Sequence, residues 1–451
     1  MASGKSLLVF ISDALGGRNF FESGIPARLG EAGVDRLTVV YAYQGQRFAA
    51  PPPPPEVTAR ELPQPAELSR GERRRLTWLT WLNQNYGFMP VALRDNKHNF
   101  NPHICEKGFP SGFFNLDHMG PLPDRPWLNR LLTRFYLGWL VRQREPRLAR
   151  VLEEARPDGV LFLNSQTYLS QALAAAALKQ GLPVAGYIQS WDHPLGKGPI
   201  LPGLARYIVQ NRQMARDLEE FHGIPVRQTA ATGWPQMDPY AQPAPKKDFA
   251  EYLSSLGLDP ELPTVLFACN TPRNAPDEDR LLADIFARRE EMLPGRRFNS
   301  IVRPHPKDRD RFEALAGQFT GVAVQKASFQ DLGLLHLCLS HVDAVVCTGG
   351  TILIDAAAHD TPVVALYFDP YDDGREIVKK NFDRFHFRRL TAYGSYLLCH
   401  DWPEFFAGLQ RTLDHPGELA PQRAQLRRDY VGELDGGAAR RVAQAVAEIL
   451  G

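Results

Sequence analysis

The sequence predicts an α/β protein built from two doubly wound domains with parallel sheets. Nine short runs are apolar without alternation, which is typical of strands buried on both faces of a parallel sheet. The runs are SLLVFIS, LTVVYAY, GVLFLNS, PVAGYIQ, ARYIVQ, TVLFAC, FNSIVRP, AVVCTG and PVVALYF. Helical patterns lie between them, and SQALAAAALKQG and NRQMARDLEEFHG each end at glycine, as helices often do. Such alternation of strand and helix predicts crossover units on an open sheet.

A stretch rich in proline and lysine, AQPAPKKDF, divides the chain near residues 240 to 248. The strand–helix pattern restarts after it, and a chain of 451 residues is too long for one ordinary domain. We therefore expect a first domain over 1–240 and a second over 241–425, facing each other across a cleft. The helical pattern of 426–451 is suited to packing back on the first domain.

Composition narrows the class of protein. A hydrophobic content of 44% is ample for two cores, and a net charge of +1 disfavours a nucleic-acid binder. The five cysteines are scattered without CxxC spacing, which argues against a disulfide framework or structural zinc and fits a reducing cytoplasm. The first apolar run fits a buried strand better than a signal peptide, and none reaches the ~18 apolar residues that span a bilayer.

Two regions depart from the alternation. The proline-rich stretch 49–67 predicts an exposed polyproline II loop. Aromatic and basic residues then recur at helical spacing, and two interpretations stay open: amphipathic helices packed on the sheet, or helices at the inner membrane surface with arginines on anionic headgroups. The aromatic residues are Trp78, Trp81, Trp127, Phe135 and Trp139.

The stretch HVDAVVCTGGTILIDAAAHD predicts a strand that runs through Gly349 and Gly350 into a helix. Ligands of open α/β sheets bind at the carboxyl ends of strands, and a glycine turn lets backbone N–H groups approach a phosphate. Thr348 and Thr351 can add hydroxyl donors, and Asp355, one turn further on, can accept from ribose hydroxyls. The alternative is a capped helix start with no ligand.

The stretch NSIVRPHPKDRDRF ends a strand in a basic cluster of Arg303, His305 and Lys307. Prolines on both sides of His305 restrict the backbone, and these three side chains suit a phosphate. The alternative is a solvated basic turn. We expect the charges that follow, in KDRDRF, to form an exposed face.

The stretch GYIQSWDHPLGKG places polar residues after another strand. Asp192 is a candidate general base for a sugar hydroxyl, and His193 is the second candidate. Ser190 and Trp191 precede them at the strand end, and Lys197 lies between two glycines on the loop. The alternative is a turn closed by the Asp192 side chain.

Two further turns follow the first strand of each half. Asn270 and Thr271 follow TVLFAC, and Gly16 and Gly17 keep the turn before the first helix thin. Both turns are expected at the interdomain cleft, and both also read as ordinary turns with caps.

Four of these motifs, in this order, resemble the GT-B glycosyltransferases related to capsule and cell-envelope polysaccharide transferases. They are SWDHPLGKG, TGWPQMD, RPHP and HVDAVVCTGGTILIDAAAHDTPVV, and they cover roughly 183 to 370. The resemblance implies two Rossmann-like domains, with the nucleotide sugar on the second, the acceptor on the first, and no essential metal.

The resemblance also implies roles for individual residues. His305 would contact donor phosphate, as in the HP motif of sialyl-, Kdo- and glycerol-phosphate transferases. Thr348 to Thr351 would cradle that phosphate, and Asp355 would hold the ribose. This chain departs from the family in reading Thr-Gly-Gly-Thr for a Ser-Ser or Ser-Thr pair, and in lacking the asparagine that often follows the aspartate of SWDHPLGKG.

We therefore expect a cytoplasmic glycosyltransferase that uses a nucleotide sugar, no cofactor, and a glycan or lipid-linked acceptor. Asp192 would take the acceptor proton, while Arg303, His305 and the helix beginning near Gly350 would stabilise the departing nucleotide. Three alternatives remain: a CDP-polyol phosphotransferase, a sugar-nucleotide epimerase, and an inactive GT-B protein that binds nucleotide or glycan.

Overall fold

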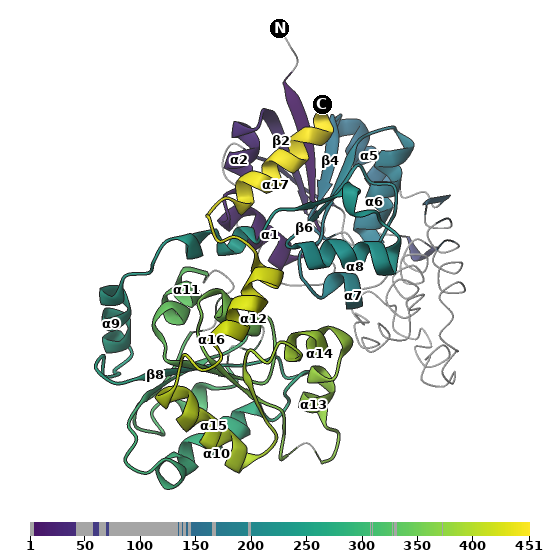
Figure 1. Cartoon of the computed structure of the whole chain (residues 1–451). Coiled ribbons are helices and arrows are strands. Elements are labelled where there is room, and N and C mark those ends of the chain that lie inside the picture. Colours follow the sequence, from purple (N-terminus) through teal and green to yellow (C-terminus); the bar gives the residue numbers. More distant parts are fainter. Residues whose placement is uncertain are drawn as a thin grey trace. The chain divides into compact units, whose positions relative to one another are not determined.

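The computed structural model describes residues 4–41, 57–62, 69–71, 134, 138, 141–142, 146–164, 168–196, 200–306, 308, 310–326, 328, 332–371 and 373–451. The chain forms two compact units (Figure 1). Unit 1 comprises Met1–Asp238 and Gly437–Gly451, and unit 2 comprises Pro239–Gly436. Residues 426–436 thus belong to unit 2, and the chain returns to unit 1 at Gly437.

Unit 1 contains a seven-stranded sheet in the order β3-β2-β1-β4-β5-β6-β7, and every strand pair is parallel. The strands are β1 (Lys5–Ile11), β2 (Val34–Tyr41), β3 (Thr58–Glu61), β4 (Gly159–Phe162), β5 (Val184–Tyr187), β6 (Arg206–Val209) and β7 (Thr229–Ala231). The helices are α1 (Ala14–Glu22), α2 (Ile25–Glu31), α5 (Pro146–Ala155), α6 (Tyr168–Lys179), α7 (His193–Gly196), α8 (Arg212–His222) and α17 (Ala438–Ala447).

Unit 2 contains a six-stranded parallel sheet in the order β10-β9-β8-β11-β12-β13. The strands are β8 (Thr264–Ala268), β9 (Asn299–Arg303), β10 (Val322–Val324), β11 (Ala344–Cys347), β12 (Val363–Leu366) and β13 (Leu397–Cys399). The helices are α9 (Lys246–Ser255), α10 (Glu278–Met292), α11 (Leu332–His341), α12 (Ile352–Ala358), α13 (Ile377–Phe382), α14 (Phe385–Thr391), α15 (Trp402–Asp414) and α16 (Ala420–Leu426). These two sheets confirm the predicted doubly wound α/β class.

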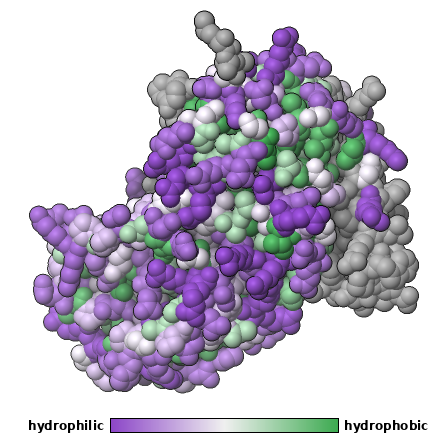
Figure 2. Space-filling model, turned by 45° about the horizontal axis from the view of Figure 1, so that its top comes forward, coloured by the Kyte–Doolittle hydropathy of each residue, from purple (hydrophilic) through white to green (hydrophobic). Residues whose placement is uncertain are grey.

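Each unit has its own hydrophobic core. In unit 2, apolar side chains of α10 and α15 pack on the central strands. In unit 1, α17 supplies Val442 and Val446 to the core beneath α1 and α2, so the last helix lies on the first sheet (Figure 1). Polar residues dominate the face shown in Figure 2. The large hydrophobic side chains exposed among the described residues are Leu15, Val226 and Met292.

All nine apolar runs form strands. The apolar pattern did not predict the four edge strands, which are β3, β7, β10 and β13. Each edge strand has three or four residues. The expected loop over 49–67 is wrong in part, because Thr58–Glu61 pairs in parallel with β2. The segment after the prolines has its amide hydrogens, so it can extend the edge of the sheet.

Several predicted residues lie outside the described part of the chain. They are Lys197, Lys307 and the aromatic residues Trp78, Trp81, Trp127, Phe135 and Trp139. Within the described residues, no helix is both long and apolar enough to cross a bilayer.

Candidate functional site

The central strands of unit 2 bring three of the predicted motifs to one edge of the sheet. Ala268 at the end of β8 pairs with Arg303 of β9 on one side and with Cys347 of β11 on the other. The order of the strands reverses between β8 and β11, and ligands of open α/β sheets bind at such a reversal, beyond the carboxyl ends. The RPHP turn, the Asn270 turn and the Gly-Gly turn therefore leave the sheet side by side.

The Gly-Gly turn after β11 has a backbone that other residues rarely adopt. Gly349 and Gly350 have φ angles of 104° and 113°. A Cβ on Gly349 would also lie 3.4 Å from the Phe382 ring. Thr351 precedes α12 but makes no side-chain cap, and it is exposed. The side-chain-capped helix start that the sequence left open is therefore not what the structure shows at Thr351.

A residue that sequence reasoning missed, Glu278, holds two of these turns together. Its carboxylate accepts the Thr348 hydroxyl at 2.7 Å and the Asn270 backbone N–H at 2.7 Å. Glu278 and Thr348 are 3% and 0% exposed. The Thr348 hydroxyl therefore holds the turn through a buried hydrogen bond and does not face solvent. The only signal in the sequence was an acidic residue at the start of a helix, which is commonplace.

Burial raises the pKa of Glu278 to about 7, although the Thr348 hydroxyl and the Asn270 N–H oppose that shift. Glu278 lies next to the turns that follow β8 and β11, where the strand order reverses. A buried carboxyl with a pKa near neutrality at such a place is a candidate for a functional site. Its contacts join the β8–α10 turn to the β11–α12 turn. The protonation state of Glu278 therefore affects the hydrogen bonds that hold both turns.

The two basic residues of the RPHP turn are placed differently. Arg303 donates to Gln325 Oε1 at 2.9 Å, and the buried Gln325 follows β10. This contact fixes a guanidinium at the carboxyl end of β9. His305 is partly exposed in the turn, and its carbonyl accepts the Asp308 N–H at 2.8 Å. The sheet thus offers a fixed cation beside an accessible imidazole.

The expectation of an exposed charged face after RPHP is wrong for Arg311. Its side chain is 11% exposed and pairs with Asp279 at 2.7 Å. It also donates to the carbonyls of Ala275 and Pro276. A guanidinium has five donors in a fixed plane, and here they fasten the RPHP loop to the start of α10. No periodicity in KDRDRF predicts this burial.

Asn270 and Thr271 act within their own turn. Asn270 Oδ1 accepts the Thr271 N–H at 2.9 Å and the Asn274 amide at 3.2 Å. The Thr271 carbonyl accepts the backbone N–H groups of Asn274 and Ala275. These contacts match the turn interpretation, while the position at the strand end matches the ligand-binding one.

Asp355 lies on the first turn of α12. Its Oδ1 accepts the Tyr240 hydroxyl at 3.3 Å, and its backbone carbonyl is 2.9 Å from His359 Nδ1. The side chain is partly exposed. The carboxylate is therefore oriented by protein and still reachable.

Unit 1 gathers the remaining predicted residues at the carboxyl edge of its own sheet. Asp13 caps α1 by accepting the Gly16 N–H at 2.8 Å, and its second oxygen accepts the Asn164 amide at 2.9 Å. The Gly17 N–H bonds the Asp13 carbonyl. A Cβ on Gly16 would come within 2.3 Å of Gln189 Nε2, so the glycine makes room for that amide.

The SWDH segment follows β5. The Ser190 hydroxyl donates to Asp192 Oδ1, and the Asp192 carbonyl accepts the Leu195 N–H at 3.1 Å. Trp191 and His193 are buried, whereas Asp192 is partly exposed. The segment therefore leaves Asp192 as the accessible carboxylate of this turn.

His222, which the sequence did not single out, closes the loop that follows. Its Nδ1 accepts the Ile200 N–H at 3.3 Å and its Nε2 bonds the Pro194 carbonyl at 2.7 Å. Burial lowers the pKa of His222 to about 4, so the ring is neutral at pH 7. One neutral imidazole thus serves both contacts.

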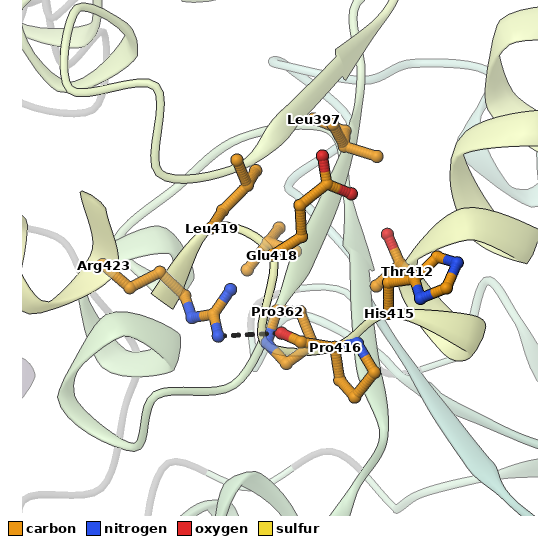
Figure 3. Close-up of a pocket in the computed structure, with 9 residues that line it drawn as sticks. Pro362, Leu397, Thr412, His415, Pro416, Glu418, Leu419 and Arg423 are labelled. Atoms are coloured by element: carbon orange, nitrogen blue, oxygen red, sulfur yellow. Dashed lines mark hydrogen bonds between the residues drawn. The ribbon is translucent and has the colours of Figure 1, made fainter. Parts of the chain in front are cut away.

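One cavity lies elsewhere. It has a volume of about 10 Å³, close to that of one water, and lies among α15, α16 and the start of β12 and β13. Figure 3 shows Arg423 beside it, bonded to the Pro416 carbonyl at 2.9 Å. Because it opens at the amino ends of these strands, it is separate from the edge described above. Among the described residues, no group of three or more His, Cys, Asp or Glu could hold a metal ion.

No protein-family model matches the chain, and no curated protein matches it in sequence. Solved structures do match its fold over nearly the whole length. One is the UDP-GlcNAc 2-epimerase of Methanocaldococcus jannaschii, with a TM-score of 0.55, 12% identity, and coverage of 98% of this chain and 99% of that one. Another is S. aureus MnaA with UDP, with a TM-score of 0.51, 10% identity, and coverage of 97% and 95%.

A third is the UDP-GlcNAc 2-epimerase of Neisseria meningitidis bound to UDP-GlcNAc, with a TM-score of 0.50, 13% identity, and coverage of 98% and 99%. At such identities the likeness shows the fold. The chain has the GT-B fold, with two doubly wound α/β units.

Proposed function

We propose that the chain is a nucleotide-sugar enzyme whose donor nucleotide binds at the carboxyl edge of the unit 2 sheet. The observation that carries this is the turn of Gly349 and Gly350, which lacks a side-chain cap at Thr351 and is followed one turn later by Asp355. Backbone amides there suit a diphosphate, and the Asp355 carboxylate suits ribose hydroxyls. Arg303, fixed by Gln325, adds positive charge beside them.

We propose glycosyl transfer, without an essential metal, to a glycan or lipid-linked acceptor as the reaction. Transfer needs stabilisation of the negative charge on the departing nucleotide, and we assign that role to Arg303 and His305 as part of the proposal. It also needs a base for the acceptor hydroxyl, and Asp192 in unit 1 is the accessible carboxylate.

Epimerisation of a nucleotide sugar is the second candidate. The solved structures that share this fold over nearly the whole chain include UDP-GlcNAc 2-epimerases, one of them bound to UDP-GlcNAc. The two reactions differ in whether a second substrate is required.

The test is incubation of the purified protein with UDP-GlcNAc, with and without a lipid-linked glycan fraction, followed by NMR of the sugar. UDP release that depends on the added fraction supports transfer. A second UDP-sugar formed without the fraction supports epimerisation. Neither reaction, with UDP-GlcNAc bound, would leave the inactive binding protein as the assignment.

The His305→Ala variant sharpens the test. Turnover should fall by at least about a hundredfold with the melting temperature little changed, since His305 is partly exposed. The exposed His415→Ala variant is the matched control and should retain activity. Full activity in His305→Ala would remove His305 from the mechanism.

A further inference from the structure

A histidine–tyrosine cluster lies where the chain enters unit 2. Tyr240 is the second residue of the unit. Its ring stacks on His336 with centroids 5.1 Å apart and lies 4.3 Å from the His359 ring. The Tyr240 hydroxyl donates to Asp355, the proposed ribose ligand. The cluster therefore connects the first segment of unit 2 to the helix that carries Asp355.

The contacts of the two imidazoles require three protons. His336 Nε2 lies 3.0 Å from the Gln242 carbonyl, and His359 Nδ1 lies 2.9 Å from the Asp355 carbonyl. Carbonyl oxygens only accept, so both of these nitrogens must carry a proton. The two remaining nitrogens, His336 Nδ1 and His359 Nε2, face each other at 2.9 Å.

Two neutral imidazoles carry two protons in total, and the carbonyls use both. The inner contact would then join two lone pairs. The Ser340 hydroxyl lies 3.4 Å from His336 Nδ1, but it donates its one proton to the His336 carbonyl at the shorter distance of 2.7 Å. One additional proton, shared between the rings, completes all three hydrogen bonds.

The surroundings restrict the pair to that one proton. Burial lowers the pKa of both His336 and His359, and each is lowered further by a nearby cation or histidine. Two protonated rings with facing nitrogens 2.9 Å apart would repel each other strongly. The titratable and charged groups around the pair are Tyr240, His341, Asp355 and Arg427, with Arg423 engaged by Asp360 at 2.8 Å.

We propose that His336 and His359 share one proton and, with Tyr240, act as positioning residues for Asp355. Uptake of the proton completes the hydrogen-bond chain from Gln242 through both rings to α12. Tyr240 is then held against His336 and the Asp355 carboxylate. Loss of the proton breaks one link, and Asp355 loses part of its support. The link to nucleotide affinity rests on the proposed function, whereas the shared proton does not.

The shared proton is tested on the full wild-type chain without ligand, by NMR of ¹⁵N-labelled histidine between about pH 8 and pH 4, because the pKa of both rings is lowered. The inner nitrogens should change together in one transition, to shifts between the protonated and unprotonated values. The outer nitrogens should stay protonated throughout. Two independent transitions, or an outer nitrogen without a proton above the transition, would overturn the proposal.

The positioning role is tested by UDP affinity at about pH 5 and pH 8 in wild type, His336→Phe and the control His415→Gln. Phenylalanine keeps a ring on Tyr240 and removes the nitrogens. From pH 8 to 5, UDP affinity should improve by at least about fivefold more in wild type and His415→Gln than in His336→Phe. The titration of UDP itself is common to all three proteins.

Identical pH profiles in wild type and His336→Phe would overturn the positioning role. If none of CMP, CDP, UDP, GDP and dTDP binds any of the three proteins, the proposed function and the positioning role that depends on it both fail; if another of these nucleotides binds in place of UDP, the same comparison is made with that nucleotide. The NMR experiment then still decides whether the proton is shared.

Discussion

The six strands of unit 2 follow the same order as the first six strands of unit 1, and the units differ in how each completes the turn where that order reverses. In unit 1, the Asp13 side chain caps α1 and also binds Asn164, so the turn is completed from within. In unit 2, two glycines in the left-handed region lead into α12, and Thr351 provides no cap. The same strand order therefore carries one helix start with a side-chain cap and one without, and we propose that a nucleotide binds at the second.

Each unit also has a titratable group with a pKa shifted by burial, and the two shifts have opposite directions. Unit 1 holds a neutral His222, and unit 2 holds Glu278 with a raised pKa. Glu278 joins two turns at the carboxyl edge of its sheet, and His222 contacts Pro194 and Ile200 in the connection between β5 and β6. The stability of the two regions should therefore depend on pH in the opposite sense.

The largest expected effect is in unit 2. Because burial raises the pKa of Glu278 from 4.5 to about 7, its contribution to stability is fully present below 4.5 and is lost as the pH rises through 7. The free energy of unfolding of wild type minus that of Glu278→Gln should fall by about 3 kcal/mol from pH 4.5 to 8. Hydrogen exchange of β8 and β11 peptides measures it. A flat difference would show that Glu278 is not held as described.

The counterpart in unit 1 should show the reverse sign. The pKa of His222 is lowered from 6.5 to about 4, so its contribution is present above 6.5 and is lost as the pH falls through 4. The difference between wild type and His222→Gln should rise by about 3 kcal/mol between those pH values. Exchange of β5 and α8 peptides reports it. The same sign in both units would break the comparison.

The turns themselves can be compared through their glycines. Gly349→Ala should destabilise unit 2 by about 2 kcal/mol, because φ is 104° and the Phe382 ring is close. Gly16→Ala should cost about 1 kcal/mol or less, since the clash is with the end of the Gln189 side chain, which can rotate. Urea denaturation of both variants checks the order. Equal costs would contradict the assigned strain.

The smallest expected effect is the difference in stability lost when the first residue before α1 or before α12 is changed to alanine. Asp13→Ala should cost about 1 kcal/mol through the lost cap of α1. Thr351→Ala should change stability by less than about 0.5 kcal/mol, because its side chain is exposed and makes no cap. Thermal melts of the two variants give the result. A larger loss from Thr351→Ala would restore the capped interpretation of that turn.

The fold was largely predictable because the buried strands of a parallel sheet leave a strong sequence pattern. The central strands β8, β9 and β11 are apolar runs. The edge strands were not predictable, because short strands that are partly exposed need no such run. Thr58–Glu61, with its Arg60, shows no apolar pattern although it pairs along β2.

The candidate site was predictable where it depends on backbone geometry. The two glycines at 349 and 350 predicted a turn between a strand and a helix, and the position of Arg303 followed from its strand. Glu278 and Arg311 escaped because their roles depend on contacts with other elements, Thr348 at 70 residues and Pro276 at 35 residues along the chain. The sequence around a charged residue does not indicate whether its partner lies in another turn of the fold.

The measurement that tests the central claim most directly is a thermal-shift panel of CMP, CDP, UDP, GDP and dTDP, with and without EDTA. The account predicts that one nucleotide, at a hundred times its dissociation constant, stabilises the protein by ~2.7 kcal/mol, with EDTA making no difference. Asp355→Ala should abolish the shift, and His415→Ala should preserve it. No shift with any nucleotide, or an undiminished shift in Asp355→Ala, would contradict a nucleotide site at the carboxyl edge of unit 2.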